Sequence, residues 1–195
     1  MEKLSDLFLE ISACKICEPE LNLGARPVVV ANAKARLMII GQAPGTKVHA
    51  TGIPWNDPSG DRLREWLQLD KDQFYNEENI AIMPMGFCYP GKIPKGGDKP
   101  PRLECAPQWH ERLKAQLPNI GLTLLVGSYA QKYYLGKEMQ KTMTETIRHY
   151  EDYLDRGFLP LPHPSWRTTG WLKKNPWFDE EVLPFLRQKT KAFLN

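Results

Sequence analysis

Four short apolar runs, separated by segments with helical patterns, most constrain how this chain can fold. The runs cover residues 36–40, 79–83, 120–126 and 158–161. Helices are expected over residues 61–69, 104–117, 128–135 and 179–193, and a short amphipathic helix precedes them near the N-terminus. Strands that alternate with helices favour a parallel sheet with helices on both faces. We therefore expect a three-layer α/β/α fold around a central four-stranded parallel sheet.

The length of 195 residues suits one α/β domain. We find no internal repeat, low-complexity tract or long linker, so a single domain over residues 1–195 is expected. No apolar run approaches the roughly 18–20 residues that cross a bilayer. The first 17 residues contain acidic side chains among the apolar ones, which is not the pattern of a secretory signal. We expect a cytoplasmic protein without membrane contact, whose thiols stay reduced.

Four cysteines form the pattern Cys-x2-Cys and, further along, Cys-x16-Cys: Cys14, Cys17, Cys88 and Cys105. Four buried small hydrophobic side chains would be the simplest explanation. The Cys-x2-Cys spacing instead favours one metal centre. A redox dithiol would normally follow a strand and open a helix, whereas this pair follows a short helix. Four thiolates suit a structural zinc or an iron–sulfur cluster, and spacing alone does not choose between them.

The segment 89–101 is rich in Pro, Gly and Lys and is expected to be an exposed loop. Residues 86–102 contain four basic residues and one acidic residue, namely Lys92, Lys95, Lys99, Arg102 and Asp98. The net charge of +3 permits a nucleic-acid partner without requiring one. The loop is therefore either an ordinary solvated surface loop or a segment that contacts phosphates. In the second case, metal ligation by the cysteines at its two ends would hold it in place.

Two loops are expected at the carboxyl ends of strands, where ligands of parallel sheets bind. Gly-Gln-Ala-Pro-Gly at 41–45 follows the first strand, and His163-Pro164-Ser165 follows the last. Gly41 and Gly45 lack side chains and Pro44 stiffens the turn, so the backbone can approach a ligand closely. These distant segments therefore predict one shared site.

Taken together, these motifs resemble the uracil-DNA glycosylase superfamily, most closely its family-four branch, which carries an iron–sulfur cluster. The segment 35–45 is similar to that branch's strand and first motif, and Thr51–Trp55 is similar to its Thr-Gly-x-Pro-Phe, with Gly60 on the glycine that follows. The cysteine spacing matches the four cluster ligands, and residues 163–165 match the second motif. The resemblance covers most of the chain, favours a 4Fe-4S cluster over zinc at the four cysteines, and implies DNA as partner and a monomer.

The resemblance also implies roles for individual residues. The enzyme would flip a base out of DNA and hydrolyse its N-glycosidic bond in base excision repair. His163 would be catalytic, donating a hydrogen bond to the leaving base. Residues expected to contact the base are Gly41, Ala43, Pro44, Gly45, Trp55 and Met85. Residues expected to contact DNA are Lys92, Lys95, Lys99, Ser165, Trp166 and Arg167.

The chain departs from the family pattern in the residues that carry the chemistry. The motif Glu is Gln42, the Asp of the best-known branch is Ala43, and the Asn that reads the base edge is Pro84. Candidate catalytic substitutes are Gln42 and His49, with Asp57 as a carboxylate near the pocket. The leading hypothesis is a glycosylase for uracil or another altered base. The alternatives are a non-catalytic iron–sulfur nucleic-acid-binding protein and a small-molecule-binding α/β protein.

Overall fold

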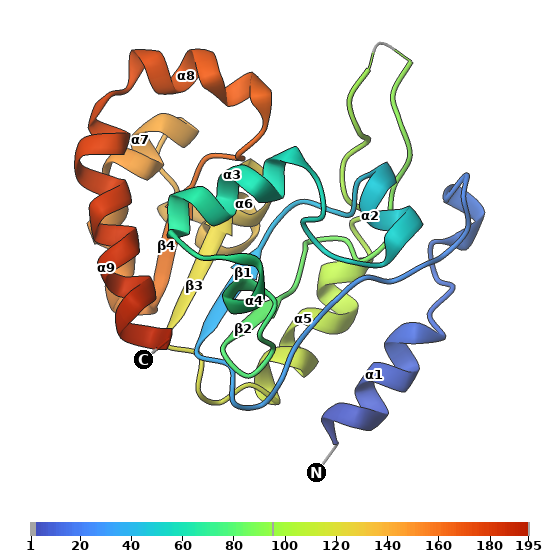
Figure 1. The fold of residues 1–195 in the computed structure, drawn as a ribbon. Helices are drawn as coiled ribbons and strands as arrows, with labels where there is room; N and C mark the ends of the chain where they lie inside the picture. The colour runs from blue at the N-terminus through green and yellow to red at the C-terminus, as the bar shows by residue number, and fades with distance from the viewer. Residues whose placement is uncertain (1–2, 95, 195) are drawn as a thin grey trace.

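The computed structural model describes residues 3–94 and 96–194. Its centre is a parallel sheet with the strand order β2-β1-β3-β4 (Figure 1). The strands are β1 (Leu37–Ile40), β2 (Ile80–Ile82), β3 (Leu122–Val126) and β4 (Phe158–Leu161). Each lies within its predicted apolar run, so the predicted four-stranded parallel sheet is confirmed.

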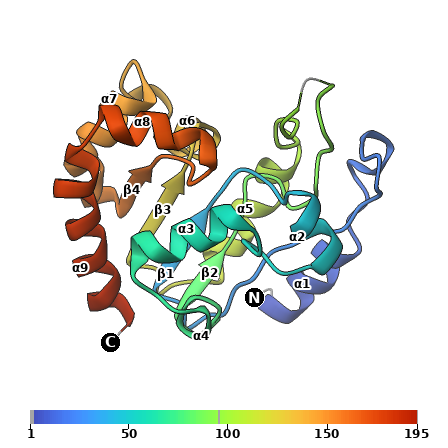
Figure 2. The same ribbon diagram turned by 45° about the horizontal axis from the view of Figure 1, so that its top comes forward.

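Helices cover both faces of this sheet, as Figures 1 and 2 show. The α-helices are α1 (Leu4–Ser12), α2 (Thr46–Thr51), α3 (Pro58–Leu67), α4 (Lys71–Phe74), α5 (Cys105–Ala115), α6 (Ser128–Leu135), α7 (Met143–Arg148), α8 (Thr169–Lys174) and α9 (Leu183–Leu194). Short 3-10 turns are η1 (Glu18–Glu20), η2 (Gly136–Glu138), η3 (Tyr150–Arg156) and η4 (Trp166–Thr168), and η5 (Phe178–Val182) is a π-helical turn. The predicted last helix is thus split into η5 and α9, and α2, α4, α7 and α8 were not predicted.

The side chains of β1 alternate between two buried cores, because successive residues of a strand point to opposite faces. Leu37 and Ile39 belong to the core packed by α3 and α9. Met38 and Ile40 belong to the core packed by α1, α5 and α6. All four residues of β1 are buried, as expected for a central strand with helices on both faces.

The first-motif loop 41–45 and the segment 163–167 both follow the carboxyl ends of strands, β1 and β4. A third segment reaches the same end of the molecule (Figure 1). It is a hairpin in which Lys92 and Asp98 form an antiparallel bridge and the Ile93 amide donates to the Gly97 carbonyl. We call residues 91–94 and 96–99 the basic hairpin. Lys95, one of the predicted DNA contacts, lies outside the described residues.

The expectation of an exposed loop over 89–101 holds only for part of the segment. Tyr89, Pro90 and Gly91 are buried, and exposure begins at Lys92. None of the helices formed by residues 3–94 and 96–194 combines the length and apolar character that crossing a bilayer needs.

Candidate active site

A cleft of about 480 Å³ opens at the carboxyl ends of the strands. Its walls come from segments far apart in the sequence: the loop 41–45, the turn from Pro54 to Ser59, Pro84, the basic hairpin and the residues 163–167. The two strand-end loops that the sequence predicts to share a site therefore line the same cleft. The volume is within the range of about 300–1,000 Å³ that is usual for small-molecule pockets.

Trp55 forms a flat wall of this cleft, directly against the first-motif loop. A Cβ atom on Gly41 would lie 2.7 Å from the indole Cζ2, so only glycine admits the ring at this distance. Trp55 has a φ of 55°, a left-handed conformation that is unusual for a bulky residue. The backbone at this position is therefore held in place by its surroundings.

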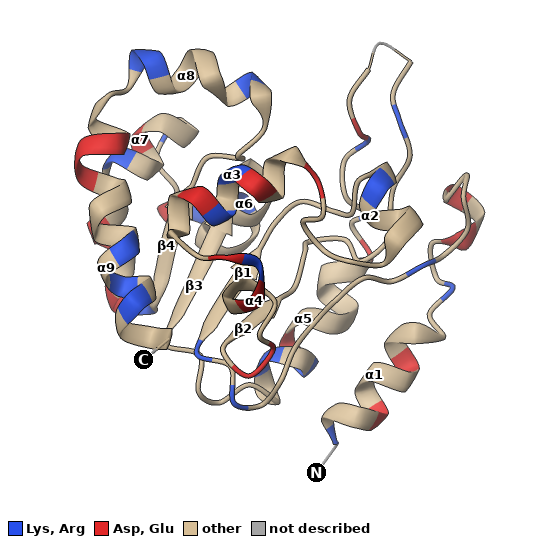
Figure 3. Ribbon diagram, viewed as in Figure 1, with Lys and Arg blue, Asp and Glu red and all other residues tan. Residues whose placement is uncertain are grey.

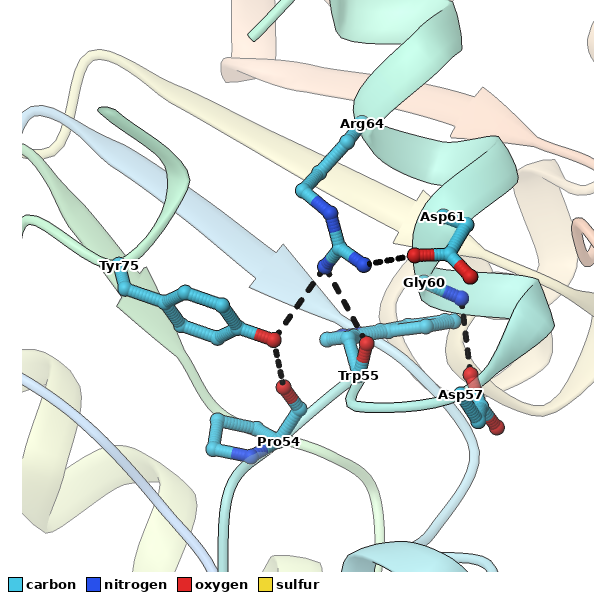
Figure 4. Close-up of polar contacts among 7 residues, drawn as sticks. All are labelled: Pro54, Trp55, Asp57, Gly60, Asp61, Arg64 and Tyr75. Atoms are coloured by element: carbon cyan, nitrogen blue, oxygen red, sulfur yellow. Dashed lines mark hydrogen bonds and ion pairs between the residues drawn. The ribbon is translucent and has the colours of Figure 1, made fainter. Parts of the chain in front are cut away.

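Hydrogen bonds to two successive carbonyls hold the Trp55 backbone, as Figure 4 shows. The Arg64 guanidinium donates to the Trp55 carbonyl at 3.2 Å, and the Tyr75 hydroxyl donates to the Pro54 carbonyl at 3.0 Å. Arg64 also donates to the Tyr75 hydroxyl and pairs with Asp61 at 2.6 Å. The Arg64 side chain is only 7% exposed, so the hydrogen bond that supports the Trp55 backbone is made by a buried charged group.

The helix start next to Trp55 fixes the same turn from the other side. Asp57 caps α3, its carboxylate accepting from the Gly60 amide at 2.8 Å. A Cβ on Gly60 would lie 1.7 Å from the Trp55 carbonyl oxygen, which no side chain could tolerate. Gly60 therefore allows α3 to begin in contact with the turn that carries Trp55.

His163 faces Trp55 in the cleft, with ring centroids 5.7 Å apart. Burial lowers the pKa of His163, and the negative charge of Asp57 opposes that shift. The imidazole is therefore neutral at pH 7 and can donate one N–H to a ligand. The Thr168 hydroxyl donates to the His163 carbonyl and fixes the loop that carries it.

The loop 41–45 uses its carbonyls for structure. The carbonyls of Gly41 and Gln42 accept from the amides of Met85 and Gly86. The amide of Ala43 has no hydrogen-bond partner among the described residues and lies in the cleft wall. The loop can therefore offer a backbone donor to a bound ligand. The Gln42 side chain instead donates to the Lys99 carbonyl at 3.3 Å.

Two predicted site residues lie away from the cleft wall. Met85 is 6% exposed and packs in the core formed with α1 and α5, while its neighbour Pro84 lines the cleft. His49 lies on α2 against Tyr89, with ring centroids 5.9 Å apart, and is absent from the cleft wall. A strand-like alternation after β2 explains why Pro84 rather than its neighbour reaches the cleft.

Three of the predicted DNA contacts form part of the rim of the cleft. Ser165, Trp166 and Arg167 line it, and Trp166 is 76% exposed. Lys92 is exposed on the basic hairpin, and the Lys99 backbone amide closes that hairpin by donating to Gly91. Figure 3 shows Lys and Arg residues on α2, α8 and the hairpin, around the end where the cleft opens.

The four cysteines come together from separate segments around one small pocket of about 20 Å³. They are free thiols, and each is partly buried: Cys14, Cys17, Cys88 and Cys105. Burial raises the pKa of Cys88 to about 11 and that of Cys105 to about 12, and the charges of the other cysteines add to both shifts. Within the described part of the chain, no three His, Cys, Asp or Glu side chains are arranged to hold one metal ion. The donors themselves are thiols, the ligand type that suits zinc and iron–sulfur clusters.

The family model of the uracil DNA glycosylase superfamily matches residues 28–187. The chain belongs to the uracil-DNA glycosylase superfamily. A type-4 uracil-DNA glycosylase of Archaeoglobus fulgidus is 27% identical over 135 residues, which cover 68% of this chain and 64% of that protein. The chain thus spans less than two thirds of that relative's length. The predicted resemblance to the superfamily and its family-four branch is confirmed.

Sequence reasoning missed one residue that supports the cleft of this superfamily member and one that lines it. Arg64 is a charged residue of the predicted helix 61–69, yet its side chain is buried and donates to the Trp55 carbonyl. Asp98 counted only as the one acid of a basic segment, yet it lines the cleft. The glycines of the basic hairpin indicate that the chain turns back there, but only the fold shows that the hairpin is directed toward the cleft.

Proposed function

We propose that this protein is a DNA glycosylase that flips uracil or another altered base and hydrolyses its N-glycosidic bond. The observation that carries the proposal is the pairing of Trp55 and His163 across one cleft, with ring centroids 5.7 Å apart. One offers a flat aromatic face and the other a neutral hydrogen-bond donor. We further propose that it acts as a cytoplasmic monomer, in one domain over residues 1–195.

The proposed reaction uses these two side chains in sequence. The extruded base stacks on Trp55, whose ring is held by Gly41 beneath it and by the Arg64 hydrogen bond to its carbonyl. The N-glycosidic bond then breaks with its electron pair on the base. The His163 N–H, and the Ala43 amide, stabilise the negative charge that develops there. A neutral imidazole suits this role because it donates one N–H without carrying a charge of its own.

The rim supports the proposal that the ligand is a nucleic acid. Trp166 is exposed on the rim beside Arg167, whose guanidinium lies over its ring at 5.6 Å. An exposed aromatic residue next to a cation can occupy the gap that a flipped nucleotide leaves and contact the flanking phosphate. Lys92 adds an exposed positive charge on the basic hairpin, bridged to the cleft residue Asp98.

We propose that the cysteine pocket holds a 4Fe-4S cluster, ligated by Cys14, Cys17, Cys88 and Cys105. The convergence of four thiols from separate segments supports this assignment, and zinc is the alternative with the same donors. The bound cluster would supply covalent cross-links that contribute folding free energy rather than react with the base. Two of its ligands flank the segment that carries the basic hairpin.

The base is read differently from the family's pattern. Pro84 occupies the position of the family's base-reading Asn, and its carbonyl already accepts from Nε2 of the buried His110 at 3.1 Å. The side chains of Ile82 and Val28 extend this apolar wall. A wall without a side-chain amide discriminates weakly between base edges, so the proposed substrate range is wider than uracil alone.

The test is an abasic-site assay on oligonucleotides with one uracil, hypoxanthine, xanthine or mismatched thymine, in single and double strands. We expect alkali-labile sites with at least one substrate, and loss of the product with His163→Ala. Asp72→Asn, on the surface helix α4, serves as the matched control and should cleave like the unaltered protein. Absence of product with every base, from protein with its metal centre loaded, would contradict the proposal. Salt-sensitive DNA binding without product would then identify a non-catalytic nucleic-acid-binding protein.

A further inference from the structure

The first-motif loop carries no acidic side chain, although cleavage of the glycosidic bond leaves a positively charged sugar and requires a water nucleophile. Positions 42 and 43 are Gln and Ala. Within the described part of the chain, the only carboxylates that line the cleft are Asp57 and Asp98. A carboxylate that assists the reaction from the cleft wall must therefore be Asp57 or Asp98.

Asp57 is committed to the local fold. One of its carboxylate oxygens accepts from the Gly60 amide and caps α3. Asp98 stands on the opposite wall, on the basic hairpin. Its Oδ2 lies 3.7 Å from where a Cβ on Gly45 would be, which places the carboxylate against the first-motif loop. Its carboxylate accepts a hydrogen bond from Tyr89 but caps no helix and forms no ion pair within the described residues, so an oxygen is left to contact a ligand.

Asp57, Asp98 and His163 line the same cleft. Partial burial raises the pKa of Asp98 and the negative charge of Asp57 adds to that rise, whereas Lys92, a hydrogen bond from Tyr89 and Arg167 lower it. Burial lowers the pKa of His163, and the charge of Asp57 opposes that shift. The leaving-group donor and a carboxylate with an elevated pKa thus face the same cleft.

A specific contact holds the hairpin in this position. The Gln42 amide donates to the Lys99 carbonyl, one residue beyond Asp98. A glutamate at position 42 has no N–H to donate and would repel that carbonyl. At the other side of the cleft, the Arg167 guanidinium packs against Gly97, 3.2 Å from where a Cβ would be. Gln42, which replaces the motif Glu, therefore holds the basic hairpin that carries Asp98.

We propose that Asp98, held by the Gln42 tether, is the catalytic carboxylate that this chain uses in place of an acid on the first-motif loop. The inference rests on the proposed glycosylase function. As the C1′–N bond breaks, its electron pair leaves on the base and Asp98 stabilises the sugar cation. The oxygen of a water molecule then bonds to C1′, the water proton passes to the Asp98 carboxylate, and it returns through solvent to the departed base.

The test measures single-turnover cleavage and DNA affinity on whichever oligonucleotide of the panel gives product. Asp98→Asn should lower the cleavage rate by about 10²–10⁴-fold, the usual contribution of general acid–base catalysis. DNA affinity should be unchanged or higher, because a negative charge near the phosphates is removed. Asp72→Asn should cleave at the unaltered rate.

The pH profile separates catalysis from a structural role. The rate should rise with pH as Asp98 loses its proton, with a midpoint above the ordinary carboxyl pKa of 3.8. Asp57→Asn keeps the α3 cap, since Asn is an equally good capping residue. It removes the charge that, after burial, adds to the raised pKa of Asp98, so the midpoint should move to lower pH. In Asp98→Asn the rise of the cleavage rate with pH that is assigned to this carboxyl group should be absent.

The tether has its own readout. Gln42→Met should lower the rate by less than Asp98→Asn, and the double variant should match Asp98→Asn alone, because the tether acts only through that carboxylate. A cleaving protein whose rate is unaffected by Asp98→Asn, or falls only in proportion to DNA affinity, overturns this inference and leaves the glycosylase function standing. A protein that cleaves none of the panel overturns both.

Discussion

Gly60→Ala tests the packing that holds the Trp55 wall, because its effect should have the opposite sign to helix propensity. In an ordinary helix, alanine in place of glycine stabilises by about 1 kcal/mol. Here the new Cβ would lie 1.7 Å from the Trp55 carbonyl oxygen, so the turn from Trp55 to Asp57 must move. That movement breaks two contacts, the Arg64 hydrogen bond at 3.2 Å and the Asp57 cap at 2.8 Å.

The magnitude follows from those contacts. A hydrogen bond to a charged group contributes about 1.5–3 kcal/mol, and an Asp cap contributes about 1 kcal/mol. After the gain in helix propensity is subtracted, Gly60→Ala should lower the free energy of unfolding by about 1.5–3 kcal/mol. For a chain of this size, the melting temperature should fall by roughly 3–12 °C.

The measurement is urea and thermal unfolding followed by far-ultraviolet circular dichroism. Gly170→Ala is the matched control, since Gly170 lies in α8 and a Cβ there would meet nothing within 4 Å. That variant should be as stable as the unaltered protein or gain up to about 1 kcal/mol. Equal stability of Gly60→Ala and Gly170→Ala would refute the contact geometry argued for the Trp55 turn.

Four further variants test other parts of the structure. His163→Gln should lower single-turnover cleavage by about 10²-fold or more with DNA affinity retained, since one leaving-group donor is misplaced; an unaltered rate would contradict its role. Burial lowers the pKa of His110 to about 4, below its ordinary 6.5. Because the unfolded chain binds this proton first, unfolding free energy should fall by roughly 3 kcal/mol as pH drops from 7 to 4, and His110→Gln should flatten that slope in urea titrations at both pH values. Cys105→Ala should abolish broad visible absorbance, and one zinc per colourless chain in the unaltered protein would disprove the cluster. Arg167→Ala should weaken DNA binding and lower the slope of log K against log salt by about 1, measured by fluorescence anisotropy, whereas an unchanged slope would rule out its phosphate contact.

The framework of the fold could be predicted from the sequence because it depends on local patterns. Apolar runs mark the strands, and the glycine-rich and His-Pro-Ser segments mark strand ends. Parallel strands place such ends at one edge of a sheet, which is why the distant loops 41–45 and 163–165 could be assigned to one site. The cysteine spacing likewise predicts convergence, and the four side chains share one pocket.

The orientation of single side chains could not be predicted in the same way. Met85 and Pro84 are adjacent, and which of them faces the cleft depends on the register of the chain after β2. His49 follows the motif closely, but the helical turn of α2 directs it against Tyr89. Arg64 has the sequence pattern of a solvated residue, and only the packing of α3 on the Trp55 turn buries it.

The cysteine pocket and the cleft are joined through the segment that carries the basic hairpin. Cys88 and Cys105 flank this segment, and the Phe87 amide donates to the Cys105 sulfur at 3.3 Å, which draws its two ends together. A loop closed at its base has fewer conformations to lose when its tip is ordered. Its tip then needs only weak contacts, those of Gln42 and Arg167, to keep Asp98 against the first-motif loop. The proposed metal centre would then act on the proposed reaction indirectly, by restricting the hairpin that carries the Asp98 carboxylate.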